Sequence, residues 1–450
     1  MIEQIQTGAD AERLSDQYNR LLGREPKLIT WYVPTDAAAQ RKAFLAGEIE
    51  NPDHTYGKLE KVDFEGNIDH ITTLGELIQD HSDLNPKFSS VYEAFASNYA
   101  AKTRLARLAH NYKQAKEPTE KARIRAEYMR LNIDLYGAPD ERTYQSLLQE
   151  KLSAINAVDY SPRGQAIRDE LFDLVDFDES AEKIDRFQPS KETVEWMHEV
   201  ADSLYGGMLA RIPDRPTFTV HETQAIFQSI INEEFGEAAA DWTVDVEPAK
   251  SINVKSTEKR IVIPHDRGNL SRAAIRGLVV HELGVHMLRA VMGGETDLDP
   301  LRQGLSDYYD AEEGLGVVME QALLGKFKEA GVGHYITAGL AYFNNLDFRG
   351  VFEAKWRLSV LENAADGRVI SELDIAKAKK TAFGATMRSF RGTDELPWFK
   401  DLAYYNGSVG VWRHLETIKG DDLMFMFVLM GKADPAKIEH QRVMYETSTY

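Results

Sequence analysis

The stretch VVHELGVHMLRA, residues 279–290, constrains the fold more than any other part of the chain. Two histidines that are four residues apart on a helix differ by about 40° around its axis, so both can face one metal ion. Here His281 and His286 are five residues apart, which is about 140° on a regular helix. A wide, π-like turn brings such positions nearly into line, and Gly284 inside the interval gives local flexibility. The spacing therefore predicts either a widened helix that carries a metal site or an ordinary helix with two unrelated histidines.

Short β-branched segments precede this helix. DWTVDVEP, SINVKS and RIVIP, at 241–248, 251–256 and 260–264, are separated by turn residues and predict a small antiparallel sheet. The helix itself is predicted to start near Asn269 or Ser271 and to end at the glycine pair 293–294, a natural C-terminal stop. The expected fold class is α+β and mostly helical, with the sheet beside the histidine helix.

The first part of the chain has a helical sequence pattern instead. Apolar residues recur at three- and four-residue spacing through 89–137, and Pro118 interrupts the pattern, which predicts a helix pair. A helix restart after Ser190 suggests a helical N-terminal domain over 1–190 and a second domain, with the histidines, over 191–450. We expect a cleft between them over His281. The apolar run LMFMFVLM, 423–430, is too short for a membrane span, which needs about 20 residues, and is predicted to be buried.

A third metal ligand is expected downstream, in SDYYDAEEGLGVVMEQALLG, residues 306–325. Asp310, or Ser306 before it, could cap a helix that carries Glu312, Glu313 and Glu320. Zinc takes imidazole and carboxylate ligands and keeps one position open in catalytic sites, so Glu313 is the predicted third ligand. Glu312 is expected to accept a hydrogen bond from a ligand histidine. The alternative is that Asp310 and Glu313 form only a capping box.

Bulk composition excludes several functions. A net charge of −19, with 72 acidic residues against 53 basic ones, argues against a nucleic-acid partner, which requires a basic face for phosphates. The absence of cysteine excludes disulfides and thiolate zinc sites. The first residues lack a basic start followed by an apolar stretch, so no secretory signal or membrane partner is expected and the predicted compartment is the cytoplasm. The sequence leaves the oligomeric state open.

The motifs HELGVH and EEGLG together resemble a metallopeptidase family. Its bacterial members are the flavohemoglobin expression-modulating QEGLA-motif proteins, and its animal members are the microtubule-associated tyrosine carboxypeptidases. VFEAKWRLSVLENA, RSFRGTDELPWFKDLAYYNG (388–407) and NPDHTY (51–56) are similar to further blocks of that family. The chain departs from the pattern where Glu312 replaces the usual Gln and Gly316 the usual Ala. The H-E-x-x-x-H spacing with a later glutamate pair is also similar to dipeptidyl peptidase III.

The resemblance implies a gluzincin-like protease domain with one zinc ion per chain, held by His281, His286 and Glu313. It implies Glu282 as the general base toward a metal-activated water. Tyr404 is the first candidate for an oxyanion donor.

The substrate implied is a peptide or protein. Its terminal carboxylate is expected to be bound by the cations of the downstream block, because guanidinium matches carboxylate in a two-pronged fashion. These cations are Arg388, Arg391 and Lys400; Arg391 is the second candidate for the oxyanion. Each of them could instead form an ordinary salt bridge at the surface.

The predicted function is therefore a zinc-dependent, carboxypeptidase-like peptidase. An aminopeptidase or dipeptidyl-peptidase activity is an alternative within the class, favoured by an acidic subsite for a free amino group. A non-catalytic, zinc-binding regulatory protein is a second alternative. A helical interaction protein with accidental motifs is a third, favoured if His281, His286 and Glu313 lie too far apart to share a metal. His265 and His334 are interpreted as local hydrogen-bonding residues.

Overall fold

The computed structural model describes residues 31–80, 89–175, 180, 184–249, 251–296, 298 and 300–447. The first residues, for which no secretory signal is expected, lie outside this part of the chain. No helix in the described part of the chain combines the length and the apolar character needed to span a bilayer.

Helices make up the first half of the described chain. α5 and α6 are the pair that the interrupted pattern predicted, with Pro118 at the first position of α6. The elements are α3 (Ala37–Leu45), η1 (Leu59–Lys61), α4 (Phe64–Asp80), α5 (Ser89–Gln114), α6 (Pro118–Tyr136), α7 (Glu141–Asn156) and α8 (Pro162–Val175).

The middle of the chain carries five short strands among helices. Ser190 caps α9 by accepting a hydrogen bond from the Thr193 amide. The elements are α9 (Lys191–Ala210), β1 (Thr217–Phe218), α10 (Val220–Ile230), η3 (Ile231–Phe235), η4 (Gly236–Ala239), β2 (Thr243–Glu247), β3 (Asn253–Lys255), β4 (Arg260–Pro264), β5 (Leu270–Ser271), α11 (Arg272–Leu278), the π-helix η5 (Val279–Met287), α12 (Leu288–Gly294) and α13 (Pro300–Gln303).

Helices return in the last third of the chain. They are α14 (Tyr309–Leu323), α15 (Val332–Tyr342), α16 (Phe348–Glu362), α17 (Glu372–Ser389), η6 (Phe399–Leu402), α18 (Ala403–Thr417), α19 (Asp422–Val428) and α20 (Ile438–Thr447). The architecture is thus mostly helical with a small sheet, as the sequence predicted.

The three-stranded sheet is mixed rather than wholly antiparallel. β3 pairs antiparallel with β4, as expected for neighbouring segments joined by a turn. β2 lies on the other side of β4 and pairs with it in parallel, with Val244 opposite Ile261. The expectation of a purely antiparallel sheet is wrong for this pair, because β4 lies between β2 and β3 and runs in the same direction as β2. Inward-facing Val244, Ile261 and Ile263 are buried in the core that contains η5.

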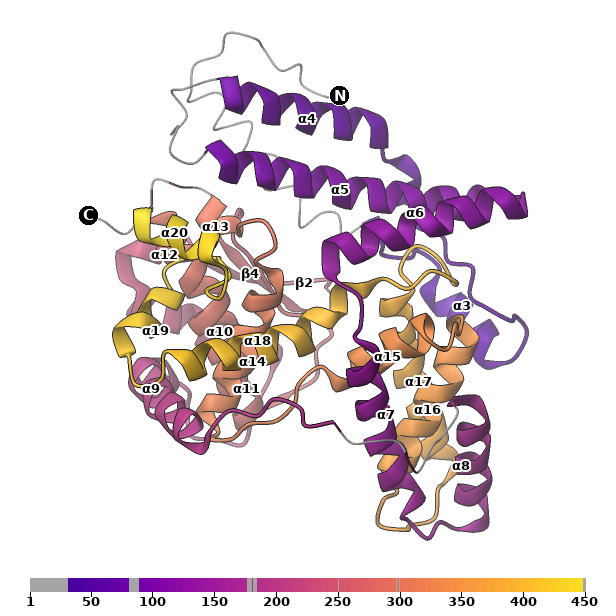
Figure 1. Ribbon diagram of the computed structural model, residues 1–450. Coiled ribbons are helices and arrows are strands. Elements are labelled where there is room, and N and C mark those ends of the chain that lie inside the picture. The colour runs from indigo at the N-terminus through magenta and orange to yellow at the C-terminus, as the bar shows by residue number, and fades with distance from the viewer. Residues whose placement is uncertain are drawn as a thin grey trace.

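The hydrophobic cores do not separate at residue 190. One core joins α9, the sheet, η5, α14 and α18. A second joins α7 and α8 with α15, α16 and α17, elements that come from opposite sides of residue 190 in the chain. Figure 1 shows these two groups of helices side by side, with α18 running from one toward the other and the pair α4 and α5 above them. The N-terminal helices are therefore integrated into the C-terminal half.

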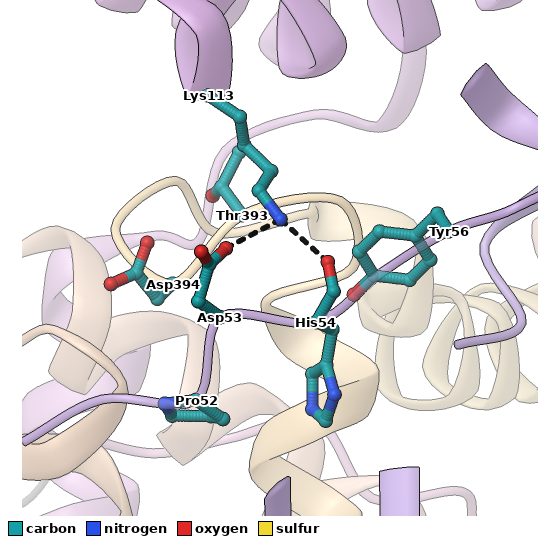
Figure 2. Close-up of a pocket in the computed structure, with 7 residues that line it drawn as sticks. All are labelled: Pro52, Asp53, His54, Tyr56, Lys113, Thr393 and Asp394. Carbon is teal, nitrogen blue, oxygen red and sulfur yellow. Dashed lines mark hydrogen bonds and ion pairs between the residues drawn. The ribbon is translucent and has the colours of Figure 1, made fainter. Parts of the chain in front are cut away.

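The NPDHTY segment is one such connection. Four of its residues line a small hollow together with Lys113, Thr393 and Asp394 (Figure 2); they are Pro52, Asp53, His54 and Tyr56. Lys113 Nζ donates to the carbonyl oxygen of His54 at 2.5 Å and pairs with Asp53 Oδ1 at 2.7 Å. The segment is thus fastened between α5 and the loop that follows α17.

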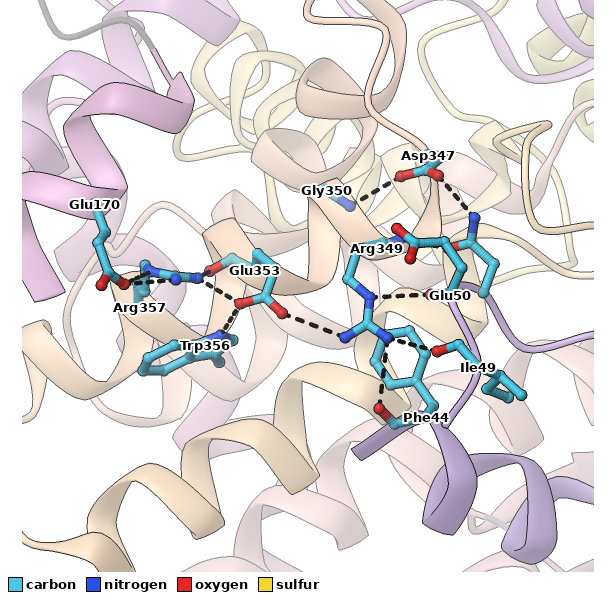
Figure 3. Close-up of polar contacts among 11 residues, drawn as sticks. Phe44, Ile49, Glu50, Glu170, Asp347, Arg349, Gly350, Glu353, Trp356 and Arg357 are labelled. Atoms are coloured by element: carbon cyan, nitrogen blue, oxygen red, sulfur yellow. Dashed lines mark hydrogen bonds and ion pairs between the residues drawn. The ribbon is translucent and has the colours of Figure 1, made fainter. Parts of the chain in front are cut away.

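A second connection runs through Arg349 on α16. Its guanidinium donates to the carbonyl oxygens of Phe44, Ile49 and Glu50 and lies 3.6 Å from the centre of the Phe44 ring (Figure 3). Nearby, the amide of Asn51 donates to Asp347 at 2.7 Å. Because one side chain satisfies three carbonyl groups, the loop after α3 is fixed to α16.

The apolar run 423–430 is only partly buried, contrary to the expectation. It forms most of the short helix α19, on which Phe425 and Val428 are fully or almost fully buried. Leu423 on the opposite face is 80% exposed and Met426 is 48% exposed. A continuous apolar run has no polar face, so a helix that packs on one side only must expose the rest.

Candidate metal site

The histidine helix is widened where the five-residue spacing requires it. Ser271 caps α11, and the helix then continues as the π-helix η5 from Val279 to Met287 before returning to regular geometry in α12. In this conformation the rings of His281 and His286 lie edge to face with their centres 4.8 Å apart. A π-helix has more residues per turn than an α-helix, so positions five apart come to one side.

Gly284 is required for packing more than for flexibility. A Cβ atom at this position would lie 2.5 Å from the ring of Tyr205 on α9. The hydroxyl of Tyr205 donates to the carbonyl oxygen of Gly284 at 3.1 Å. α9 therefore supports the widened turn with a hydrogen bond that a side chain at position 284 would displace.

The structure brings His281, His286 and Glu313 together. One donor atom from each lies within 4.8 Å of the others, and they are the metal-competent cluster found among the described residues. Ligands of a tetrahedral zinc ion at about 2.0–2.2 Å are about 3.4 Å apart, a separation that small side-chain rotations reach from here. The condition that favoured accidental motifs, three residues too distant to share a metal, is not met.

α14 supplies both Glu313, the candidate acidic ligand, and the hydrogen-bonding partners of the two histidines. Glu320 Oε1 lies 2.6 Å from His281 Nδ1, and Glu312 Oε1 lies 2.8 Å from His286 Nδ1. Glu313 and Glu320 are seven residues apart and share one face of α14, whereas Glu312 is adjacent to Glu313 and points about 100° around the helix, toward His286. Because each Nδ1 is engaged by a carboxylate, each Nε2 is left as the ligand atom. The donor set and these partners fit zinc.

Gly316 lies on the same face, where α14 approaches the first histidine. A Cβ atom here would lie 2.7 Å from the His281 ring. The alanine of the family pattern would therefore require the imidazole to move away from α14. Glycine at position 316 therefore allows the His281 ring to lie directly against α14.

Glu312 is a buried carboxylate with cationic partners. It is 3% exposed, and Lys432 Nζ lies 3.0 Å from its Oε1 while Arg289 Nη1 contacts its Oε2. Burial raises the pKa of Glu312, but Lys432, Arg289 and His286 outweigh burial and hold it well below its usual range. Glu312 is thus ionised and accepts the Nδ1 proton of His286.

The surroundings of His281 are strongly negative. Burial lowers the pKa of His281, but its hydrogen bond to the Glu320 carboxylate and the charges of Glu282, Glu320 and Glu313 raise it to about 9. A field that stabilises a proton on this ring also favours a metal cation in its place. Glu282 itself is buried on η5, 9% exposed, and follows His281 directly in the chain.

The downstream cations differ in their availability. Arg388 forms a two-pronged contact with Asp401, through Nε and Nη2 at 2.9 Å each. Arg391 and Lys400 have no carboxylate partner of this kind among the described residues; Arg391 lies over Trp398 and Lys400 Nζ lies 3.6 Å from the centre of the Tyr309 ring. Burial lowers the pKa of Lys400 to about 8, while Asp401 and Glu313 act in the opposite direction. The structure therefore leaves two partly buried cations, Arg391 and Lys400, of which Lys400 lies within electrostatic reach of Glu313.

Two tyrosines lie within electrostatic reach of Glu313. Burial raises the pKa of Tyr404 to about 12, and the charge of Glu313 adds to this effect. The ring of Tyr404 stacks on His334, with centres 5.3 Å apart. Burial and the neighbouring Glu313 also raise the pKa of Tyr309. Both phenols are neutral donors at pH 7.

The expected cap of α14 requires correction. Neither Asp310 nor Ser306 caps α14, because the helix starts after Tyr308 and shows no side-chain cap. The capping-box alternative for Asp310 and Glu313 is therefore wrong. The cleft expected over His281 stays a prediction; the side chains of His281 and His286 are 14% and 11% exposed. The hollow in Figure 2 is lined by other residues.

Several supporting residues were missed from the sequence. Glu320 was placed on the right helix without a role, although its spacing of seven from Glu313 puts both on one face. His334 was set aside, yet it stacks on Tyr404. Arg289 and Lys432 had no sequence signal, because tertiary folding alone brings them to Glu312.

Comparison with known families supports the resemblance drawn from the motifs. Residues 189–328 match the family described as microtubule-associated tyrosine carboxypeptidase. The matched segment contains His281, Glu282, His286 and Glu313, whereas the cations of 388–400 lie outside it. No curated protein matches the chain's sequence.

Proposed function

We propose that this protein is a zinc-dependent peptidase of the carboxypeptidase type. The single observation that carries the proposal is the convergence of His281, His286 and Glu313 on one point, with the donor atoms within 4.8 Å. The family match supports a carboxypeptidase-type peptidase and protein substrates. The helix with the H-E-x-x-x-H spacing, followed by a helix that bears the third ligand, supports a gluzincin-like arrangement.

In this proposal the three ligands hold zinc through the two Nε2 atoms and the Glu313 carboxylate. Bound there, zinc supplies Lewis acidity toward a carbonyl and lowers the pKa of a bound water. Glu320 and Glu312 hold the imidazoles in the orientation and tautomer that ligation requires.

Glu282 is the proposed general base. It follows the first ligand directly and lies on the buried side of η5. A carboxylate at this place takes a proton from the attacking water and delivers it to the leaving amine. Its presence favours catalysis over the alternative of a non-catalytic, zinc-binding regulator, because a purely structural site requires no base beside its ligand.

Arg391 and Lys400 are proposed to bind the terminal carboxylate of the substrate. Both carry positive charge without a carboxylate partner among the described residues, and Lys400 lies within electrostatic reach of Glu313. Arg388 is occupied by Asp401, so we assign it to the support of the subsite. A cationic subsite favours the carboxypeptidase direction over an aminopeptidase, which requires an acid for the free amino group.

Tyr404 is proposed to donate its phenolic hydrogen to the developing oxyanion. Its raised pKa keeps it protonated at pH 7, and the His334 ring fixes its plane. Hydrogen-bond donors in a water-poor site act most strongly where charge develops.

The cytoplasmic location expected from the sequence stays a prediction.

The test compares wild type with Glu282→Gln on a mixed peptide library. The wild type is expected to release single residues from free C-termini. The variant keeps all three ligands, so it is expected to keep zinc and to lose at least about 100-fold in rate, the usual contribution of a general base. Equal rates in the two proteins, or cuts confined to the N-terminal end, would contradict the proposal.

A further inference from the structure

We propose that the charge of Glu312, balanced by the buried cations Arg289 and Lys432, sets the affinity of the site for zinc. The three act as positioning residues behind His286. The inference rests on the proposed function, because it concerns the zinc site, and it adds Lys432, which lies outside the matched residues 189–328.

The contacts of Glu312 use both carboxylate oxygens. Oε1 accepts from His286 Nδ1 at 2.8 Å and lies 3.0 Å from Lys432 Nζ. Oε2 is held by Arg289 Nη1. A carboxylate held on both oxygens cannot turn away from the ligand histidine.

The two cations are fixed parts of the interior. Arg289 on α12 is 0% exposed and Lys432 is 5% exposed. Lys432 lies between α19 and α20, where its amide donates to the Leu301 carbonyl at 2.7 Å and its own carbonyl accepts from the Leu305 amide at 2.9 Å. Arg289 also donates to the carbonyl oxygen of Ala433. The C-terminal part of the chain is thus joined to the back of the metal site.

Charge counting shows what Glu312 contributes. One carboxylate and two cations leave a net charge of +1 beside neutral His286. Glu312→Gln preserves an acceptor for the Nδ1 proton but raises this net charge to +2, next to a site that takes a dication. Unpaired buried cations repel the metal and destabilise the fold. Lys432→Met in the same background returns the sum to +1.

The experiment measures zinc dissociation constants by competition with a chelating dye, and melting temperatures of the metal-free proteins. Four proteins are compared with wild type: Glu312→Gln, Lys432→Met, the double variant of both, and Lys437→Met as a control. Lys437 lies on the same segment but is partly exposed and 3.9 Å from Asp307.

We expect Glu312→Gln to weaken zinc binding by about 10- to 100-fold, the usual range for changes to a residue that supports a ligand, because the variant leaves two buried cations without their counter-charge. The double variant is expected to recover at least half of this loss on a logarithmic scale, and Lys437→Met to bind like wild type. A residue with only a structural role would lower the melting temperature and leave the zinc constant unchanged, which would overturn the inference. A double variant that binds zinc no better than Glu312→Gln would overturn it as well.

The inference can still be tested if the Glu312→Gln variant fails to fold. If Glu312→Gln does not fold, Lys432→Met alone is expected to bind zinc at least as tightly as wild type, because it lowers the net charge. Weaker binding by this variant would overturn the inference. A wild type that binds no zinc would overturn the proposed function itself. This result differs from one in which the wild type binds zinc and Glu312→Gln binds it equally well, which would overturn only the present inference.

Discussion

Removal of either free cation of the proposed carboxylate subsite should abolish much of the preference for free C-termini. Lys400→Met and Arg391→Met each delete one charge-assisted hydrogen bond to the substrate carboxylate. Such bonds contribute about 1.5–3 kcal/mol. A change of 1.36 kcal/mol is about tenfold, so each variant should lose about 10- to 150-fold in kcat/KM.

The assay compares paired peptides that end in a free carboxylate or in an amide. The loss should appear for the acid and be small for the amide, so the ratio of the two kcat/KM values reports the subsite. Lys380→Met on α17 is the control, because Lys380 is exposed. The double variant should lose less than the two losses combined, since both cations contact one carboxylate.

Arg388 gives a contrasting result that sharpens the test. Its partner Asp401 is 7% exposed, so Arg388→Met leaves a buried carboxylate unpaired and should cost about 3–5 kcal/mol of stability. Its effect on the ratio of acid to amide should be smaller than that of Lys400→Met. An unchanged ratio in both Lys400→Met and Arg391→Met would refute the assignment of the subsite.

Three further predictions follow from particular contacts. Burial lowers the pKa of Lys400 to about 8, so kcat/KM for free-acid peptides should fall as pH rises through this value, and Lys400→Arg should remove the fall. Gly407→Ala should cost about 1–3 kcal/mol in urea unfolding, because its methyl group would meet the Asp310 carbonyl oxygen at 1.8 Å; Gly410→Ala, with open space, should not destabilise. Burial raises the pKa of Glu416, but hydrogen bonds from the first turn of α9 lower it to about 2. Because this folded-state pKa is depressed, Glu416→Gln should cost about 1–2 kcal/mol at pH 7, and the difference from wild type should disappear as pH falls from about 4.5 toward 2.

Local patterns predicted the centre of the site. The five-residue spacing of His281 and His286 required a widened turn, and η5 is that turn. The β-branched segments and the helix limits were placed within a few residues because turn residues and glycines bound them. The next helix was expected to bring Glu313 to the histidines, and the structure places it there.

Contacts between distant parts of the chain were beyond the sequence. Lys432 reaches Glu312 only through the path of the chain after α19. The sequence does not distinguish the role of Arg388 from that of Lys400, because only the fold shows that Asp401 pairs with Arg388. The predicted boundary at residue 190 rests on a change from helical to β-branched sequence patterns. The core between α7 and α16 depends on packing between distant helices, which the pattern of a single helix does not encode.

The most direct measurement is a crystal structure with anomalous diffraction collected at the zinc absorption edge. The account predicts one peak per chain, about 2.0–2.2 Å from the Nε2 atoms of His281 and His286 and from a carboxylate oxygen of Glu313. Histidine Nδ1 atoms should keep their bonds to Glu320 and Glu312. Zinc-loaded crystals without a peak among these three residues, or with the metal bound elsewhere, would contradict the account.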